Sequence, residues 1–384
     1  MTDRLYYHDC YLRQFPARVI ESLDDGRRLV LDRTAFYPSS GGQPFDLGTL
    51  GGAAVIDVLD DGDKLIHVVD KPVTGDVTGE VDWARRYDHM QQHTGQHLLS
   101  AVFEELYGIK TVSFHMGAEV STIDVEADAL KPSQLERIEE RCAALVAEAR
   151  PVLITFEDAS ADLGLRKASD RSGTLRIVSI EGLDRSACGG THVRSTAEIG
   201  AILTRKLEKV RATTRVEFVC GNRSLRAARG DFRTLVELAR ITSATFEDMP
   251  AMVSQQLEKG KALEKTAQRL ASELAKREGG ELHAATAPGA DGIRRVTVRG
   301  PIDEATRARA QAFIAGGKAV FLAVSADPAS VLLAASADSD VHAGNRVKEA
   351  VTAAGGRGGG NQNVAQGSVP AGELEKVLAA LSAA

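Results

Sequence analysis

Two short histidine motifs lie far apart in the sequence, and a chain that uses both must fold so that they meet. The first is HTGQH, from His93 to His97, inside a segment whose pattern predicts a single helix; the second is CGGTH, from Cys188 to His192. On a helix, an i, i+4 spacing places both imidazoles on one face about one turn apart. The two glycines of the second motif allow a turn tight enough to bring its thiolate and imidazole together. Any fold that unites the motifs must therefore lay this turn against that helix.

The four side chains form a ligand set of one sulfur and three imidazoles. Such a set suits tetrahedral zinc, so we predict a zinc site formed by His93, His97, Cys188 and His192. His89, one helical turn before His93, is an alternative ligand. Its place beside the helix cap favours a position outside the ligand set or facing solvent. A metalloprotease is excluded because Thr94, Gly95 and Gln96 fill the motif, without the glutamate of HExxH.

The amino-terminal part reads as short strands. ARVIESLDDGRRLVLDRT and AAVIDVLDDGDKLIHVVD each place two alternating apolar runs around an Asp-Gly turn, which predicts two hairpins and a small β-barrel over residues 1–85. Between them, Phe36 to Gly48 is too rich in Gly, Pro and Ser for regular structure and is predicted to be a loop.

The middle part mixes helices and strands. Asp88, with Gln91 as its box partner, is a cap for a helix that runs to Leu106 and ends at Gly108. Further on, Thr111 to Val125 reads as a strand, PSQLERIEERCAALVAEA as a helix, and TLRIVSIEG and RVEFVCG as strands. We predict a two-layer α+β domain that binds zinc over residues 86–222.

The last part divides into a helical spacer and a small domain. Apolar residues recur every three or four positions from Val253 to Leu274, so residues 223–279 are predicted to form a helical spacer, either a hairpin within the chain or a coiled coil. Residues 280–384 begin with a breaker-rich linker and then alternate strands with helical segments, which predicts an α/β domain. A homodimer through the spacer or this domain is one interpretation of the pattern. The overall fold class is α+β.

Composition indicates the cellular compartment of the protein and how it could bind a polyanion. The four cysteines form no CxxC pair, which suits a reducing compartment, and no segment has the apolar length of a membrane span, so we expect a cytoplasmic protein. Lys and Arg number 47 against 53 Asp and Glu, a net charge of −6, so any polyanion must bind a local patch. Such a patch runs from Arg205 to Arg233 and otherwise reads as a solvated face.

Three motifs agree in order and setting: FYPSSGGQPFDLG, HTGQH and CGGTH. With them the chain resembles the alanyl-tRNA editing family, which comprises the freestanding AlaX proteins and the editing domain of alanyl-tRNA synthetases. Ala353 to Ser368 resembles the glycine-rich signature of the carboxy-terminal domain that these synthetases share with DHH-type phosphoesterases, although Asn361 to Asn363 depart from it. The whole is most similar to a long-form AlaX.

The resemblance implies hydrolysis of the ester that joins serine or glycine to the terminal adenosine of tRNA(Ala). It places Gly41, Gly42 and Gln43 beside the substrate pocket, with Ser40 where another glycine is common, and His115 near a polar pocket position. His93, His97, Cys188 and His192 fall on the family's zinc ligands. No adenylate-forming region precedes the editing-like half, so we expect no need for ATP.

An aminoacyl ester is already activated, so the enzyme needs only to place water, polarise the carbonyl and stabilise the oxyanion. Zinc could supply hydroxide or organise the substrate; four protein ligands leave no easy opening, so we favour the organiser. To spare correctly charged tRNA, the site should require a hydroxyl on the amino acid. The candidate catalytic residues that could read it are Gln43, Thr94, Gln96 and His115.

The basic patch then becomes a contact for the tRNA backbone, and we predict that Arg205, Lys206, Lys209 and Arg211 bind it. Two alternatives stay open. One is a tRNA-binding module without catalysis, because a closed four-ligand site is typical of structural zinc. The other is editing of another aminoacyl-tRNA, because threonyl-tRNA synthetases carry a related domain.

Overall fold

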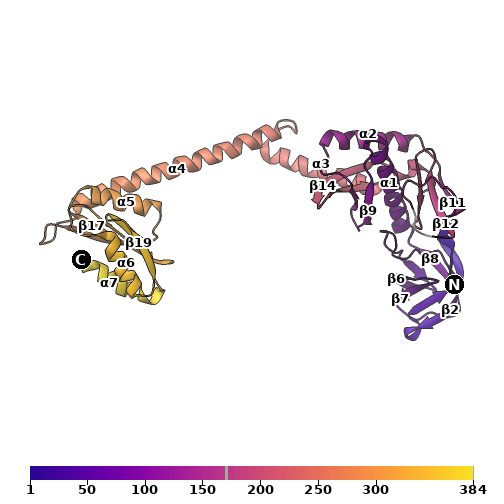
Figure 1. Ribbon diagram of the computed structural model, residues 1–384, viewed down its shortest axis with the longest axis horizontal. Helices are drawn as coiled ribbons and strands as arrows, with labels where there is room; N and C mark the ends of the chain where they lie inside the picture. Colours follow the sequence, from indigo (N-terminus) through magenta and orange to yellow (C-terminus); the bar gives the residue numbers. More distant parts are fainter. Residues whose placement is uncertain (169–171, 384) are drawn as a thin grey trace. The chain divides into compact units, whose positions relative to one another are not determined.

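The computed structural model describes residues 1–168 and 172–383, which form two compact units, Met1–Leu238 and Ala239–Ala384 (Figure 1). Residues 169–171 and 384, which belong to the predicted domains 86–222 and 280–384, lie outside the described residues. Along the described chain, no helix combines the length and apolar character needed to cross a bilayer. Both units mix helices with sheets, which confirms the α+β class.

Six strands near the amino terminus close into a barrel in the order β2-β3-β7-β6-β5-β8. Both Asp-Gly segments are antiparallel hairpins, β2 with β3 and β6 with β7. The strands and short helices of this region are β1 (Asp3–Arg4), η1 (Leu5–Tyr7), β2 (Gln14–Leu23), η2 (Asp24–Gly26), β3 (Arg28–Leu31), β4 (Arg33–Thr34), β5 (Gly48–Leu50), β6 (Ala53–Asp61), β7 (Lys64–Val69) and β8 (Asp76–Val81). Alternate side chains fill the barrel with an apolar core.

The central helix α1 (Trp83–Tyr107) carries the first histidine motif and begins earlier than predicted. Its cap is Asp82, whose side chain accepts from the amide of Arg85, and it ends at Gly108 as predicted. The predicted cap Asp88 is wrong because this residue lies inside the helix, where its carboxylate accepts hydrogen bonds of 2.6–3.0 Å from Arg223. A long-range ion pair thus uses the side chain that the local pattern assigned to capping.

Two sheets and a second helix surround α1. One sheet has the order β14-β15-β10-β9 and the other β11-β12-β13. Thr111 to Val125 is a hairpin rather than one strand, with Gly117 in its turn. The elements are β9 (Thr111–Met116), β10 (Ser121–Val125), α2 (Pro132–Ala147), β11 (Val152–Asp158), β12 (Thr174–Ile180), β13 (Asp184–Ala187), η3 (Thr196–Ile199), β14 (Ile202–Val210) and β15 (Thr213–Cys220).

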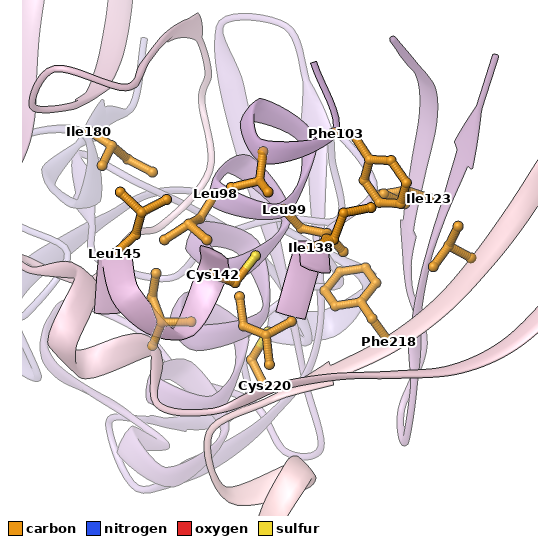
Figure 2. Close-up of a cluster of buried hydrophobic side chains, with 14 of the residues drawn as sticks. Leu98, Leu99, Phe103, Ile123, Ile138, Cys142, Leu145, Ile180, Phe218 and Cys220 are labelled. Carbon is orange, nitrogen blue, oxygen red and sulfur yellow. The ribbon is translucent and has the colours of Figure 1, made fainter. Parts of the chain in front are cut away.

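The core of this part forms where α1 packs against α2 and the four-stranded sheet. Figure 2 shows Leu98, Leu99 and Phe103 of α1 beside side chains of both neighbours. The partners drawn there from α2 and the sheet are Ile123, Ile138, Cys142, Leu145, Phe218 and Cys220. Packing of this kind fixes the rotation of α1 about its axis, and therefore the direction in which its histidines point.

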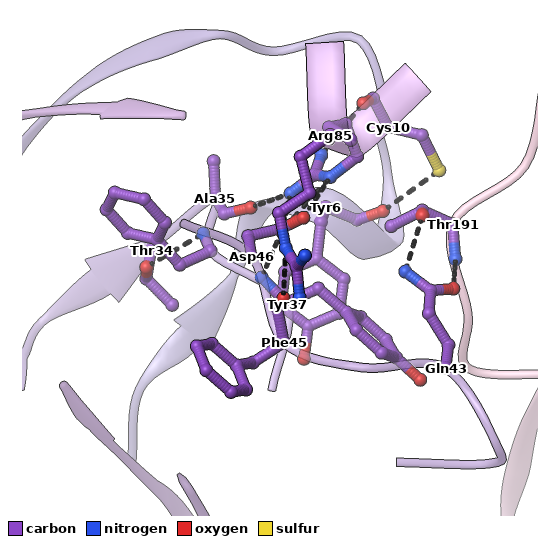
Figure 3. A network of polar contacts seen from close by, with 12 residues as sticks. Tyr6, Cys10, Thr34, Ala35, Tyr37, Gln43, Phe45, Asp46, Arg85 and Thr191 are labelled. Carbon is purple, nitrogen blue, oxygen red and sulfur yellow. Dashed lines mark hydrogen bonds and ion pairs between the residues drawn. The ribbon is translucent and has the colours of Figure 1, made fainter. Parts of the chain in front are cut away.

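A buried ion pair joins the start of α1 to the predicted loop Phe36–Gly48. Arg86 and Asp46 are both fully buried, and the guanidinium also donates to the carbonyl oxygens of Cys10 (2.9 Å) and Ala35 (2.5 Å). Asp46 additionally accepts from the amide of Tyr37 at 2.7 Å (Figure 3). Because every charged atom of the pair has partners, the loop is held rigidly against the helix.

The second unit is built on a five-stranded sheet in the order β16-β17-β18-β20-β19, in which only β16 and β17 are parallel. The predicted strands in this region are confirmed. The glycine-rich Arg357–Gly360 is the edge strand β19, paired with β20. The elements are β16 (Arg294–Arg299), α5 (Glu304–Ala315), β17 (Ala319–Ala326), β18 (Ala329–Ala335), α6 (Ala343–Ala353), β19, β20 (Val364–Ser368), η4 (Ala371–Glu373) and α7 (Leu374–Ser382).

Two long helices, α3 (Asn222–Thr242) and α4 (Met249–Ala285), occupy the predicted spacer. The predicted linker at residue 280 is wrong for its first part, because α4 continues as a helix through Ala285 despite its glycines. The carboxy-terminal end of α4 packs on α5 in the second unit, where Gly279 lies against the backbone of Arg309. Further back along α4, the apolar positions predicted to form a seam are exposed; they are Val253, Leu257, Leu263, Leu270 and Leu274.

Candidate metal and active site

The two histidine motifs meet in the structure. The ligand atoms of His93, His97, Cys188 and His192 all lie within 4.8 Å of one another. Cys188 Sγ is 3.4 Å from His93 Nε2 and 3.3 Å from His192 Nε2. Zinc bonds of about 2.3 Å to sulfur and 2.0–2.1 Å to nitrogen place tetrahedral S and N ligands about 3.6 Å apart. The observed spacing therefore fits zinc.

Each histidine is oriented by a partner on its other ring nitrogen. His93 Nδ1 is 2.8 Å from Gln43 Oε1, His97 Nδ1 is 2.8 Å from Asp184 Oδ2, and His192 Nδ1 is 3.1 Å from Thr94 Oγ1. These contacts leave each Nε2 directed toward the shared centre. Outer hydrogen bonds of this kind fix the tautomer and ring orientation of metal-binding histidines.

Glycines allow the backbone segments to come close enough. Gly41 and Gly42 have φ of 56° and 83°, and mutual hydrogen bonds between Ser40 and Gln43 close the tight turn that they form. The glycines of CGGTH act differently from the prediction, since neither has positive φ. A Cβ on Gly190 would lie 2.1 Å from His93 Cε1, so this position needs glycine for space rather than for its backbone angles.

The charges in the cluster are set by burial and by close contacts. Burial opposes the Cys188 thiolate, but the neighbouring His93 and His192 outweigh it and hold the pKa of Cys188 well below its usual range. Burial lowers the pKa of His192 to about 3. Burial also opposes charge on His97, yet its hydrogen bonds to Asp184 and Cys188 raise its pKa to about 9. The thiolate and the neutral His192 are the forms that bind metal.

The cluster opens into a cavity of about 810 Å³, a size typical of ligand sites. His93, His97 and Cys188 lie in its wall, and we call it the metal cavity. Its charged lining among the described residues consists of four cations and one carboxylate: Arg4, Arg166, Lys167, Arg176 and Asp60. Its aromatic lining is Tyr6, Tyr7, Tyr37, Phe114 and Phe156. The cavity is therefore suited to an anionic ligand with a planar ring.

The four candidate catalytic residues differ in their position relative to the metal cavity. Gln96 lines the metal cavity and donates to Ser100 Oγ at 2.9 Å. Gln43 and Thr94 are buried outside the cavity lining, against His93 and His192, and Gln43 is also bonded to Thr191. His115 is exposed on β9, next to Phe114, and does not line the cavity. Of the predicted pocket glycines, Gly41 reaches the lining.

The predicted tRNA contacts lie on β14 and in the turn that follows it, outside the lining of the metal cavity. Three of them form ion pairs: Arg205 with Asp231, Lys206 with Glu208 at 3.6 Å, and Lys209 with Asp128 at 2.7 Å. Arg211 occupies the turn before β15, with φ of 54°.

Sequence reasoning missed several residues of the site. Asp184 supports His97 and is itself held by Arg166, whose Nε lies 2.6 Å from Asp184 Oδ1. Arg176 donates to the carbonyl oxygen of Cys188 at 2.6 Å, which fixes the start of the CGGTH turn. Single charged residues on strands have no spacing signal of their own, and their partners are remote in sequence; the only cue was that Asp184 precedes Cys188 by four residues.

Comparison with known proteins agrees with this geometry. Residues 175–216 match the threonyl and alanyl tRNA synthetase second additional domain, and residues 303–384 match the DHHA1 domain. The chain is 30% identical to the alanyl-tRNA editing protein AlaX-L of Pyrococcus horikoshii over 97% of this chain and 95% of the relative. It is 36% identical to AlaX-M of Methanosarcina acetivorans over 54% of this chain and 94% of the relative. An alanine–tRNA ligase of Pyrobaculum calidifontis is 33% identical over 99% of this chain and 44% of the ligase.

The fold and the His/Cys cluster thus define an aminoacyl-tRNA hydrolase of the editing type, as the sequence predicted. The chain belongs to the alanyl-tRNA editing protein family, and it spans nearly the full length of the long relative AlaX-L.

Proposed function

We propose that this protein removes serine or glycine from mischarged tRNA(Ala) by hydrolysing the ester to the terminal adenosine. The observation that carries the proposal is the convergence of His93, His97, Cys188 and His192 beside the metal cavity, in whose wall the first three lie. Relatives named as alanyl-tRNA editing proteins support tRNA(Ala) as the tRNA that is edited. The four free cysteines suit a reducing compartment, and we propose the cytoplasm.

The ligand set fits Zn²⁺, so we propose a zinc-dependent enzyme. When bound by these four residues, zinc supplies positive charge that can polarise the ester carbonyl or hold the aminoacyl group. Gln43, Thr94 and Asp184 keep the three imidazoles in the tautomer and orientation that ligation needs.

The rest of the metal cavity binds and selects the substrate. Among the described residues Lys167 is the lining cation that has no ion-pair partner and whose one hydrogen bond is long, at 3.4 Å to the carbonyl oxygen of Val112. We therefore propose that it pairs with the phosphate of the terminal nucleotide and that the aromatic rings contact the adenine. Gln96 is the predicted hydroxyl reader that lines this cavity, so we propose that its carboxamide hydrogen-bonds the serine side chain. Gln43 and Thr94 are better placed as positioning residues for His93 and His192.

For the whole chain, we propose that residues 1–85, 86–222, 223–279 and 280–384 act as barrel, editing domain, spacer and carboxy-terminal domain. Arg205, Lys206, Lys209 and Arg211 remain proposed contacts of the tRNA backbone. The exposed leucines of α4 support a homodimer through the spacer, because a seam of this kind is stable when a second helix covers it. A monomeric mass in light scattering would contradict the dimer.

The test of function is deacylation of purified Ser-, Gly- and Ala-charged tRNA(Ala), with and without a chelator. We expect loss of Ser-tRNA(Ala), slower loss of Gly-tRNA(Ala) because glycine has no hydroxyl for Gln96 to bind, survival of Ala-tRNA(Ala), and inhibition by the chelator. Cys188→Ala should abolish hydrolysis but keep tRNA binding, whereas Cys142→Ala, in the apolar core away from the cluster, should remain active. In the same assay, Gln96→Leu should slow Ser-tRNA(Ala) more than Gly-tRNA(Ala).

Binding of tRNA without hydrolysis of any charged form would favour the module with structural zinc. Hydrolysis of another misacylated tRNA in place of tRNA(Ala) would favour the second alternative.

A further inference from the structure

A second cavity, of about 350 Å³, lies beside the amino-terminal half of α1. Residues of α1, the amino-terminal end of α3 and the turn between β9 and β10 line it. We call it the α1–α3 cavity. The residues that characterise its wall are Trp83, Arg85, Tyr87, His89, Arg223 and Arg226.

His89 has an unused polar atom in this wall. The side chain is only 2% exposed, and its Nδ1 is buried without a hydrogen-bond partner in the described part of the chain. Buried polar atoms of folded proteins are nearly always paired, so an orphan in a cavity wall points to a ligand that completes it. His89 is not part of the metal cluster, and burial, together with the neighbouring Arg85 and Arg223, lowers its pKa to about 3. The ring is therefore neutral at pH 7.

The remaining wall combines guanidinium groups with aromatic rings. Arg223 is committed to Asp88, and Arg85 donates to the carbonyl oxygen of Phe45 at 3.0 Å. Arg226 is exposed, and among the described residues it has neither an ion-pair nor a hydrogen-bond partner. The rings of Trp83 and Tyr87 lie 5.5 Å apart. Proteins hold unpaired nucleotides by stacking the base on an aromatic ring and pairing the phosphate with a cation. This wall offers both kinds of group.

The α1–α3 cavity is a close neighbour of the metal cavity. His89 precedes His93 by one helical turn, a rise of about 6 Å. The loop Phe36–Gly48 reaches both places, since Gln43 orients His93 and Phe45 accepts from Arg85. The β9–β10 hairpin does so too, with Phe114 in the metal cavity and Ala118 in the second. A strand that enters one cavity therefore has the other within reach.

We propose that the α1–α3 cavity binds an unpaired nucleotide of the tRNA acceptor strand, upstream of the terminal adenosine whose ester is cleaved in the metal cavity. The base contacts Trp83 or Tyr87 and bonds to His89 Nδ1, and the phosphate pairs with Arg226. This inference rests on the proposed function, because it takes the same charged tRNA as the ligand.

The test compares a long and a short substrate in the zinc-loaded full-length protein. Seryl-tRNA(Ala) can fill both cavities, whereas the seryl ester of adenosine alone can fill only the first. We expect Arg226→Ala and His89→Phe each to raise KM for seryl-tRNA(Ala) about three- to tenfold and to leave the adenosine ester unaffected. Arg226→Ala should also reduce the slope of log KM against log salt by about 1. Arg137→Ala, an exposed arginine on α2, is the matched control and should match wild type.

A binding measurement keeps the two proposals apart. Fluorescence anisotropy of a labelled single-stranded RNA ending in CCA should show weaker binding to Arg226→Ala and His89→Phe than to wild type and Arg137→Ala. Equal KM and equal binding across all four proteins would overturn the inference. If wild type hydrolyses neither substrate, the proposed function fails, and the RNA-binding comparison still decides whether the cavity holds a nucleotide.

Discussion

Asp184→Asn is the sharpest test of the proposed zinc site. Asp184 is 3% exposed and lies 2.8 Å from His97 Nδ1, with Arg166 and Ser186 bonded to the same carboxylate. Asparagine keeps the shape but removes the negative charge that raises the basicity of His97. Losses of such outer carboxylates weaken metal binding 10- to 100-fold, which is about 1.4–2.7 kcal/mol.

The assay is competition for zinc against a chelator of known affinity at pH 7. Burial opposes charge on Asp184, but its contacts with His97 and Arg166 hold its pKa at about 2, so the wild-type carboxylate is ionised throughout the assay. The control is Asp76→Asn, which removes an aspartate from an exposed ion pair with Arg18 and should leave zinc affinity unchanged. Melting of the metal-free proteins separates lost affinity from lost folding. Equal zinc affinity in a folded Asp184→Asn protein would refute the reasoning.

Two further perturbations test close packing and pH dependence. Gly190→Ala places a methyl group 2.1 Å from His93 Cε1, so the purified protein should contain little zinc by metal analysis; Gly189→Ala, whose Cβ meets nothing nearer than 3.5 Å, should keep it. His67 is buried in the barrel, where burial lowers its pKa from 6.5 to about 4. Its neutral form stabilises the fold above pH 6.5, and this contribution of about 3 kcal/mol is lost as the pH falls from 6.5 to 4. Urea unfolding at pH 7 and pH 4 should show the loss in wild type and a smaller one in His67→Gln.

Local signals in the sequence predicted much of the first unit. The Asp-Gly turns predicted both barrel hairpins, and the end of α1 at Gly108 followed from a residue that readily adopts positive φ. The start of α1 did not follow, because Asp82 and Asp88 both precede helical residues and only the contact with Arg223 distinguishes them. Strand β14 was missed because charged residues interrupt the apolar pattern of ILTRKLEKV, as is common in a strand at the edge of its sheet.

The meeting of His93, His97, Cys188 and His192 could be predicted from the sequence. Histidine and cysteine are uncommon residues, and within each motif they lie only a few positions apart. The cavity beside it could not, because its wall draws on the amino-terminal Arg4 and Tyr7, on the loop at Gly41 and on the strands that carry Arg176 and Ser186. Apart from Gly41, which the resemblance placed beside the pocket, none of these residues has a recognisable pattern in its own segment. They line one cavity only because the amino-terminal segment, the loop Phe36–Gly48 and strands β12 and β13 meet there in the folded chain.

The barrel can be understood as part of the metal site rather than as a separate attachment. Asp46, at the end of the loop Phe36–Gly48, is clamped by Arg86 of α1, and the same loop carries Gln43 to His93. A fully buried ion pair is tolerated only when its remaining atoms are satisfied, and here backbone groups of Cys10, Ala35 and Tyr37 satisfy them. The orientation of His93, a proposed zinc ligand, therefore depends on the barrel being folded and docked. A fragment that contains both histidine motifs but lacks residues 1–82 would leave Arg86 without Asp46 and His93 without Gln43, so the two motifs alone do not make a complete site.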